Sequence, residues 1–411
     1  MKIISNIYKQ QLIKPWLAGA VMIFSGFGIT GCSDSDSDAG PTDNFVKIYN
    51  NELFDIAYNP LDVKQTSDGT YIILSTANET DTYLLRVNEF GEFISDTIIS
   101  TPYTNPLSEL FLVNDEYHFF SMDNVTLSTY LLKVNLSDSN QVPELVQSFP
   151  EIIYPLHASQ VSDGGFLIQS YNREARSTAL TKLDASFNQS WQAEYEVLED
   201  VEASIIAKFA GTGERSLPYF TGSSDDGSIY FLNGFYNFSF SLLFVNGSNG
   251  DLIGTLNGLR EETGVSAAMH LTGDQYALSR FSFEDNFILP TGTINIQGNE
   301  FSGEIGGNEF PEILPHARVI VKRLVINGMD AIVYGTETKS KQIALYIYDA
   351  VDGTLINSKY FGNSNPYEFG NFALTDDGGI AVVGRTFVAG RFPRVVFFKM
   401  SQEEVNALVQ Q

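Results

Sequence analysis

Apolar runs on either side of an Asp-Gly pair recur along most of the chain, and they predict tight β-hairpin turns. The clearest copies contain Asp68-Gly69, Asp163-Gly164 and Asp377-Gly378, and a fourth contains Asp226-Gly227. In such a turn the Asp side chain accepts backbone N–H groups and the Gly takes a positive φ, so that the flanking residues form two antiparallel strands. We therefore expect these Asp residues to have a structural role. Weaker copies of the pattern occupy residues 114–117, 273–276 and 327–330.

A second β-rich run follows each turn, as at 83–88 and 130–135, and most of these runs precede a further turn and a fourth strand. Gly69 and Gly378 are six intervals apart, which gives about 51 residues per unit. Four strands in a unit of this length are typical of one blade of a β-propeller. The pattern predicts an all-β fold, a β-propeller of seven four-stranded blades over residues 45–411. Irregular segments at 196–216 and 287–315 leave six or eight blades open.

The two ends of the repeat region predict how the ring closes. The last unit has its third strand at 395–400 and is followed by an acidic tail with no fourth strand. Residues 44–49 resemble the fourth strands of other units, such as 191–195. We therefore expect the N-terminal strand to complete the last blade and remove its open edge. A helical pattern is weak everywhere before residues 402–411.

The first 31 residues have the pattern of a secretory signal peptide. They carry Lys2, Lys9 and Lys14 and no acid, and an uncharged apolar segment runs from 15 to 31. The segment Ile29-Thr30-Gly31-Cys32 resembles the lipobox of bacterial lipoproteins. That resemblance implies cleavage before Cys32, lipidation of its thiol and anchoring to the membrane. Residues 32–44 follow as an acidic tether, and Ser33 resembles the residue that directs enterobacterial lipoproteins to the outer membrane. The face of the membrane stays open.

The charge of the chain excludes some partners. It has 24 Lys and Arg against 50 Asp and Glu, a formal charge of −26, so no basic surplus exists to neutralise the phosphates of a nucleic acid. Cys32 is the only Cys and the four His are far apart in sequence, which argues against a metal site. We find no motif for a cofactor and no serine-hydrolase signature around a nucleophile.

The repeats resemble bacterial β-propellers over nearly the whole mature chain. Residues 345–353 also resemble a turn of the PQQ-type repeat, as found in the propeller lipoprotein of the outer-membrane barrel-assembly machine. Blades of that type lock together through tryptophans, whereas Trp191 is the only Trp after the predicted signal peptide. We treat the resemblance as one of architecture, which transfers no function.

Candidate ligand-binding residues follow from the register of the turns. In a propeller the first strand of each blade lines the central channel, and the loops that enter it form the usual binding face. The residues expected at this channel mouth are Asp62, Glu109, His157, His316, Glu368 and Asn371. They suit a cation, a sugar or an acid/base pair. The interpretation preferred from sequence is simpler, namely solvated loop residues of an acidic protein, and no catalytic residue is assigned.

Two functional hypotheses remain. The preferred one is an envelope lipoprotein, anchored through Cys32 and placed at the outer membrane, whose propeller binds or scaffolds a protein partner. The alternative is a carbohydrate-active or other envelope hydrolase or lyase with carboxylates at the channel mouth. A glycan or small ligand is compatible with both. A quinoprotein is the weakest possibility because the tryptophans are missing.

Overall fold

The structure is a computed structural model that describes residues 43–49, 55–136, 142–210, 217–388 and 392–410. The predicted signal peptide at 1–31, the predicted lipidation site Cys32 and most of the predicted tether at 32–44 lie outside the described residues. The described part is almost entirely β-structure, with helices only at α1 (Glu202–Ala210) and α2 (Gln402–Ala407).

Consecutive strands form antiparallel meanders, and the first half of the chain contributes three groups of four. The first group comprises β2 (Tyr58–Gln65), β3 (Tyr71–Ala77), β4 (Asp81–Val87) and β5 (Phe93–Thr104). The second comprises β6 (Phe111–Val113), β7 (Glu116–Met122), β8 (Ser128–Lys133) and β9 (Glu144–Ile153). A single pair, Thr104 with Met122, joins these two groups into one eight-stranded sheet. The third comprises β10 (Pro155–Gln160), β11 (Phe166–Asn172), β12 (Ser177–Leu183) and β13 (Gln189–Glu196).

The second half of the chain continues the meander with two further sheets that contain additions. One has β14 (Phe220–Ser223), β15 (Ile229–Tyr236), β16 (Ser239–Asn246) and β17 (Leu252–Asn257), with β21 (Asn299–Phe301) added in parallel to β17. The other has β18 (Thr263–Thr272), β19 (Gln275–Ser282), β20 (Asp285–Thr293) and the short β22 (Asn308–Glu309). Within the irregular segment at 287–315, β20 ends at Thr293, and the following turn is closed by the N–H of Gly298, which donates to the carbonyl of Asn295.

The last two sheets bring the ends of the chain together. One contains β23 (Ile320–Ile326), β24 (Met329–Glu337), β25 (Ile343–Asp349) and β26 (Leu355–Phe361). The other contains β27 (Tyr367–Leu374), β28 (Ile380–Thr386), β29 (Arg394–Met400) and, from the N-terminal side, β1 (Phe45–Tyr49). β1 is antiparallel to β29, with Phe45 opposite Lys399 and Tyr49 opposite Val395. The first described strand therefore pairs with the last.

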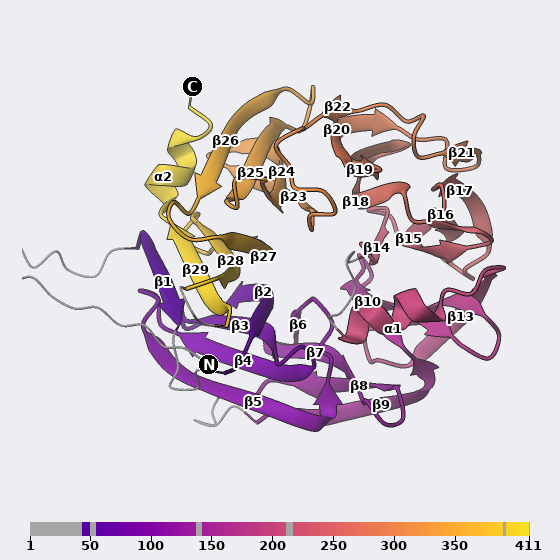
Figure 1. The fold of residues 1–411 in the computed structure, drawn as a ribbon, viewed down its shortest axis with the longest axis horizontal. Helices are drawn as coiled ribbons and strands as arrows, with labels where there is room; N and C mark the ends of the chain where they lie inside the picture. Colours follow the sequence, from indigo (N-terminus) through magenta and orange to yellow (C-terminus); the bar gives the residue numbers. More distant parts are fainter. Residues whose placement is uncertain (1–42, 50–54, 137–141, 211–216, 389–391, 411) are drawn as a thin grey trace, which may run out of the picture. The chain divides into compact units, whose positions relative to one another are not determined.

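The sheets stand around a central opening as the blades of a β-propeller do (Figure 1). The innermost strands are β2, β6, β10, β14, β18, β23 and β27. Each is joined to the next strand at one of the seven predicted turns, weak copies included. The second and third strands, such as β3 and β12, are buried along their whole length because apolar side chains of neighbouring sheets pack on both faces. Each fully buried Leu or Phe there contributes about 1.5–3 kcal/mol to folding.

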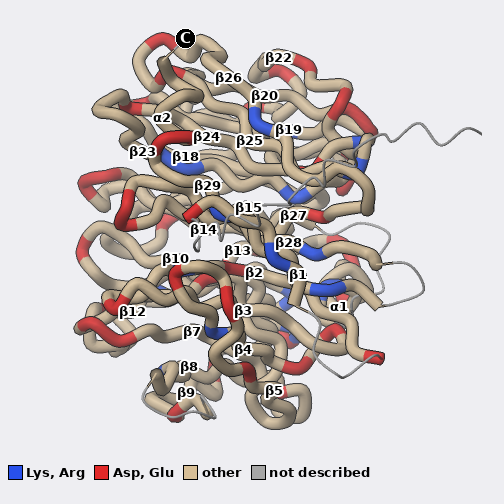
Figure 2. Tube along the Cα trace, turned by 90° about the vertical axis from the view of Figure 1, so that its left-hand side faces the viewer, with Lys and Arg blue, Asp and Glu red and all other residues tan. Residues whose placement is uncertain are grey.

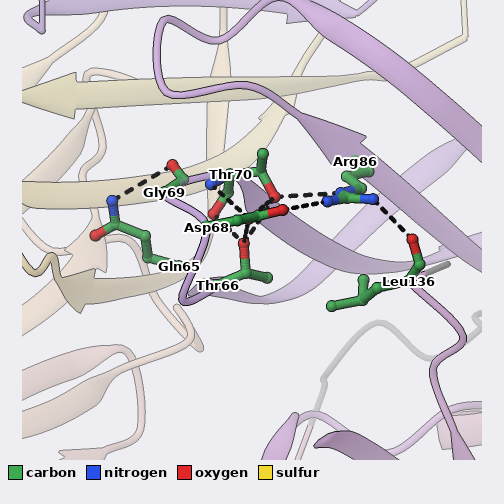
Figure 3. A network of polar contacts seen from close by, with 7 residues as sticks. All are labelled: Gln65, Thr66, Asp68, Gly69, Thr70, Arg86 and Leu136. Carbon is green, nitrogen blue, oxygen red and sulfur yellow. Dashed lines mark hydrogen bonds and ion pairs between the residues drawn. The ribbon is translucent and has the colours of Figure 1, made fainter. Parts of the chain in front are cut away.

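The Asp-Gly turns have the predicted hydrogen bonds, and most contain a cation that we did not predict. In Figure 3 the Asp68 carboxylate accepts the N–H of Thr70 at 3.1 Å and the guanidinium of Arg86, on β4, at 2.6 Å. Hydrogen bonds, chiefly from the Thr66 hydroxyl, lower the pKa of Asp68 to about 2. In the same way, Asp163 binds Lys182 and Asp377 binds Lys399, each at 2.8 Å. The turn carboxylate thus ties the first hairpin of the blade to its third strand.

The predicted insertion at 196–216 contains α1, a helix that the sequence pattern did not indicate. Its Ile205 is 1% exposed and packs in a cluster with Val201, Tyr219 and Phe240. Tertiary packing of this kind, rather than intrinsic propensity, stabilises a helix of nine residues. By contrast α2 lies within the segment where a weak helical pattern was expected, and Ser401 caps it by accepting the N–H of Glu404.

Candidate functional site

A cavity of about 960 Å³ lies among the innermost strands. Its wall contains residues of β2, β10, β14, β18, β23 and β27 and of the segment before β6. Four of the six residues proposed from sequence line it: Glu109, His157, His316 and Asn371. Asp62 and Glu368 do not line the cavity, but each binds a residue that does.

Asp62 connects three segments of the inner wall. Its side chain is fully buried and accepts the side-chain amide of Asn371 on β27 at 2.8 Å. The other carboxylate oxygen accepts the N–H of Leu110, before β6, at 2.8 Å and lies 3.4 Å from the ammonium of Lys64. A buried carboxylate with partners from three segments holds the innermost strands together and has little capacity left for a ligand.

Lys64, Glu109 and Lys322 form a mixed-charge group beside Asp62. Burial raises the pKa of Glu109, and Lys64 opposes this shift only in part. Desolvation, followed by repulsion from Lys64, lowers the pKa of Lys322 to about 8. The Lys322 ammonium donates a hydrogen bond to the carbonyl of Phe372 at 2.5 Å and lies 5.1 Å from the centre of that ring.

A second group contains two cations, Lys208 and Arg318, and the imidazole of His157. Asp62 and Glu337 act on Arg318 only in part against the effect of its burial. Lys208 comes from α1 and Arg318 from the loop before β23. Desolvation and the charge of Arg318 lower the pKa of Lys208 to about 8. Desolvation lowers the pKa of Arg318 to about 10, so the guanidinium stays charged at neutral pH. Both values lie below the ordinary ones, which are about 10.4 for Lys and above 12 for Arg, chiefly because burial removes water from the charged groups.

His157 is neutral in this environment. Desolvation, then Lys208 and Arg318, lower its pKa to about 3. The Nδ1 atom lies 3.2 Å from the hydroxyl of Thr221, which in turn lies 2.6 Å from the hydroxyl of Ser159. When Ser159 donates to Thr221 and Thr221 donates to Nδ1, the proton of the ring is on Nε2. A neutral imidazole of this tautomer acts as a hydrogen-bond donor and carries no charge.

Glu368 is part of a separate pair at the wall. The Nε of Arg385, a residue that lines the cavity, donates to the Glu368 carboxylate at 2.6 Å. Nearby Glu337 accepts the N–H of Phe369 at 3.1 Å. Burial, with the charge of Glu368, raises the pKa of Glu337 to about 7.

His316 completes the set of predicted residues. It has a positive φ of 58° in the loop before β23, and its ring lies edge-on to Phe281 at 6.4 Å. It lines the cavity on the side of Arg318 but is not among the groups that shift the pKa of the cations there.

The cations are the residues that sequence reasoning missed. Lys64, Lys208, Arg318 and Lys322 all line the cavity, whereas the residues expected there from sequence were three acids, two His and one Asn. Two of them had a usable signal, because Lys64 and Lys322 occupy innermost strands. Lys208 had none, because it belongs to the unpredicted helix.

Comparison with known proteins adds the fold alone. A scan against protein-family models finds no match, and a search of curated proteins finds none either. Among solved structures the chain is similar to the Dos1 propeller, with 10% identity, a TM-score of 0.46 and coverage of 82% of this chain and 78% of that one. It is also similar to the β-propeller domain of the Trilobed protease from Pyrococcus furiosus, whose reported topology is an open velcro (10% identity, TM-score 0.44, coverage 86% and 98%). A third is the AfRom2 CNH domain (7% identity, TM-score 0.43, coverage 86% and 99%).

Membrane-spanning helices and metal-binding clusters are both absent from the residues that the structure describes. None of the described helices has the length and apolarity needed to cross a bilayer. Within the same residues, no group of three or more His, Cys, Asp and Glu has the arrangement of a metal site.

Proposed function

We propose that this chain is a lipid-anchored envelope protein whose β-propeller is a binding module, with the central cavity as its recognition site. The observation that carries the proposal is the cavity itself. Its volume of about 960 Å³ is at the upper end of the range for ligand sites in proteins, and polar side chains project into it from seven segments of the chain. Rigid inner strands hold those side chains, which favours recognition by a preformed site.

The ring is proposed to have seven blades. The eight-stranded sheet counts as two groups of four, since only the pair Thr104 and Met122 links them. That count gives one group for each of the seven turns. The pairing of β1 with β29 supports closure by the N-terminal strand.

The membrane anchor is proposed from the sequence Ile29-Thr30-Gly31-Cys32 and the apolar segment before it. Localisation to the outer membrane rests on the same segment and on Ser33. We also propose a protein partner in the envelope. A segment of that partner, or a ligand that it delivers, would bind in the cavity.

A binding role is favoured over the hydrolase alternative by the state of the carboxylates. Asp62 has its oxygens occupied by Asn371 and the N–H of Leu110, and Glu368 is paired with Arg385. A glycoside-cleaving pair needs one carboxylate free to act on the substrate and a second one across the bond. Asp62 and Glu368 are engaged in holding the wall, which leaves Glu109 as the one predicted carboxylate that lines the cavity without a hydrogen-bond partner among the described residues.

Site-specific photocrosslinking in intact cells tests the recognition site. A photoreactive amino acid replaces Ser223, at the cavity end of β14, and in a control replaces Val351, which is 86% exposed on the β25–β26 turn. We expect an adduct of defined mass from position 223 and none of that mass from position 351. Adducts from position 351 alone would move the recognition site to the outer surface and overturn the proposal.

A further inference from the structure

The cavity gathers positive charge in a strongly acidic protein. The chain has 24 Lys and Arg and 50 Asp and Glu, and the residues that line the cavity include six of the former and four of the latter. Figure 2 shows the Asp and Glu positions on loops along the margins of the ring. Lys and Arg therefore outnumber Asp and Glu along the cavity wall, whereas Asp and Glu outnumber Lys and Arg in the chain as a whole. The cavity is locally basic.

Three of the six cations are already compensated. Arg323 binds Asp330 through its Nε at 2.8 and 3.0 Å from the two carboxylate oxygens. Arg385 is paired with Glu368, and Lys64 lies 3.4 Å from Asp62. These three positive charges are used within the wall and leave little attraction for a ligand.

The other three, Lys208, Arg318 and Lys322, have no ion pair with any residue in the part of the chain that the structure describes. Arg318 is their common neighbour, because its charge acts on both Lys208 and Lys322. Lys208 is held against aromatic rings, with its ammonium 4.9 Å from the centre of Phe209 and 6.0 Å from that of Tyr219. Rings position the ammonium but do not neutralise it.

Placing three such cations near one another costs free energy unless an anion joins them. Burial is the main cause that lowers the pKa values of Lys208, Lys322 and Arg318. Carboxylates of Asp62, Glu109 and Glu337 oppose the shift of Lys322 or Arg318 only in part, and none of these described carboxylates forms an ion pair with the three cations. A protein retains an arrangement of this kind where a ligand supplies the missing charge, because charge-assisted hydrogen bonds are the strongest available to polar side chains.

We propose that the cavity binds a small anionic ligand bearing carboxylate or phosphate groups, which Lys208, Arg318 and Lys322 hold. This inference rests on the proposed function, since it names the ligand class for the same recognition site. The planar guanidinium of Arg318 suits two oxygens of one anionic group, and the two lysines supply point charges on either side. The neutral His157 donates from Nε2 to the same ligand when Thr221 donates to its Nδ1.

Isothermal titration of the full-length protein in a nonionic detergent tests the inference. The probes are pyrophosphate and citrate at pH 7 and fixed ionic strength, with glucose as an uncharged probe. We expect at least one anion to bind and glucose not to bind. The preference between pyrophosphate and citrate then distinguishes phosphate from carboxylate recognition.

The variants locate the binding. Arg318→Gln is expected to weaken anion binding by about ten- to a hundredfold, the effect of losing hydrogen bonds to a charged group. Lys208→Gln on α1 is a second test should Arg318→Gln fold poorly. Arg323→Gln is the matched control, because it removes a cation from the same wall whose charge Asp330 already compensates, and we expect less than about a twofold change.

Binding of neither anion, or equal losses in Arg318→Gln and Arg323→Gln, would overturn the inference. Crosslinking from position 223 distinguishes failure of the anion-binding inference from failure of the proposed function. An adduct that persists in Arg318→Gln and Lys208→Gln means that the cavity is the recognition site but its ligand is not anionic. The absence of both adduct and anion binding removes the two proposals together.

Discussion

At the scale of single residues, the turn carboxylates differ in what they hold. Lys399 is 1% exposed, and within the described part of the chain its ammonium has only Asp377 and the carbonyl of Met400 as partners. Asp226 stands at the corresponding place in another turn but binds only the hydroxyl of Ser224 and the N–H and hydroxyl of Ser228 among the described residues. One turn therefore compensates a buried charge and the other forms only local hydrogen bonds.

Removal of the two carboxylates is expected to have unequal effects. Asp377→Ala leaves the buried ammonium of Lys399 without its counter-ion and should lower the free energy of unfolding by about 2 kcal/mol, below the full value for a buried pair because Asp377 is 42% exposed. Asp226→Ala should lower the free energy of unfolding by clearly less, because no buried cation among the described residues depends on Asp226. Denaturant unfolding of both variants measures the difference, and equal losses would show that the turn hydrogen bonds, not the lysine, account for the effect.

Glu337 makes the stability of the folded state depend on pH. Its pKa in the folded state is about 7, above the value of about 4.3 for an exposed Glu. A carboxyl whose pKa rises on folding favours the folded state while it is protonated. Its contribution is therefore complete below pH 4 and is lost as the pH rises through 7.

Glu337→Gln should remove this loss, because the amide keeps an acceptor for the N–H of Phe369 and has no charge to desolvate. We expect the variant to be more stable than the wild type at pH 8 by about 3 kcal/mol and at pH 5 by only about 1 kcal/mol, because most of the loss occurs between these two pH values. Unfolding by denaturant at the two pH values measures this. A difference that is the same at both values would contradict the assignment.

At the scale of elements, β1 is the strand whose role is easiest to isolate. It pairs with β29 along five residues, and Phe45 packs edge-on against Phe397 with ring centres 5.2 Å apart. Without β1 the edge of β29 is left unpaired, and an unpaired edge favours association with other chains.

Deletion of residues 44–50 should lower the melting temperature by roughly 5 °C and promote aggregation. Val46→Thr is the control, because Val46 is 57% exposed and the substitution keeps the strand backbone. Calorimetry and light scattering provide the measurements. An unchanged melt after the deletion would mean that β1 contributes nothing to the last sheet.

Elements also show what the sequence could and could not predict. The seven turns were predictable because Asp-Gly chemistry is local and its flanking strands repeat. The helix α1 was not, because its stability comes from Ile205 packing on residues such as Tyr219 and Phe240. The three cations Lys208, Arg318 and Lys322 were missed for a related reason, because only the arrangement of the blades around the central opening brings α1 and β23 to the same cavity. Asp62 was expected at the channel mouth but lies inside β2, and its partner Asn371 is 309 residues away, so no local pattern could indicate their contact.

At the scale of the whole molecule, charge and anchor act in opposite directions. A formal charge of −26 repels the anionic surface of a membrane, so electrostatic attraction cannot hold the protein there. Once the predicted signal peptide is removed, the proposed lipid on Cys32 would supply the membrane affinity.

Cys32→Ala should therefore release the protein from the membrane fraction without changing its melting temperature. Fractionation of cells that express either form, with immunoblotting of the soluble and membrane fractions, measures the distribution. Retention of the variant in membranes to the same extent as the wild type would rule out the lipid anchor.

The pairing of β1 with β29 also has a consequence for biosynthesis. Phe45 and Lys399 are paired although they are 354 positions apart in the chain, so this sheet depends on contacts between residues that are very far apart in sequence. During synthesis β1 leaves the ribosome before every other described strand, and its partner β29 leaves after all of them. The sheet that joins them therefore cannot form while the chain between them is being made, a delay that would keep the protein open for the export that we propose.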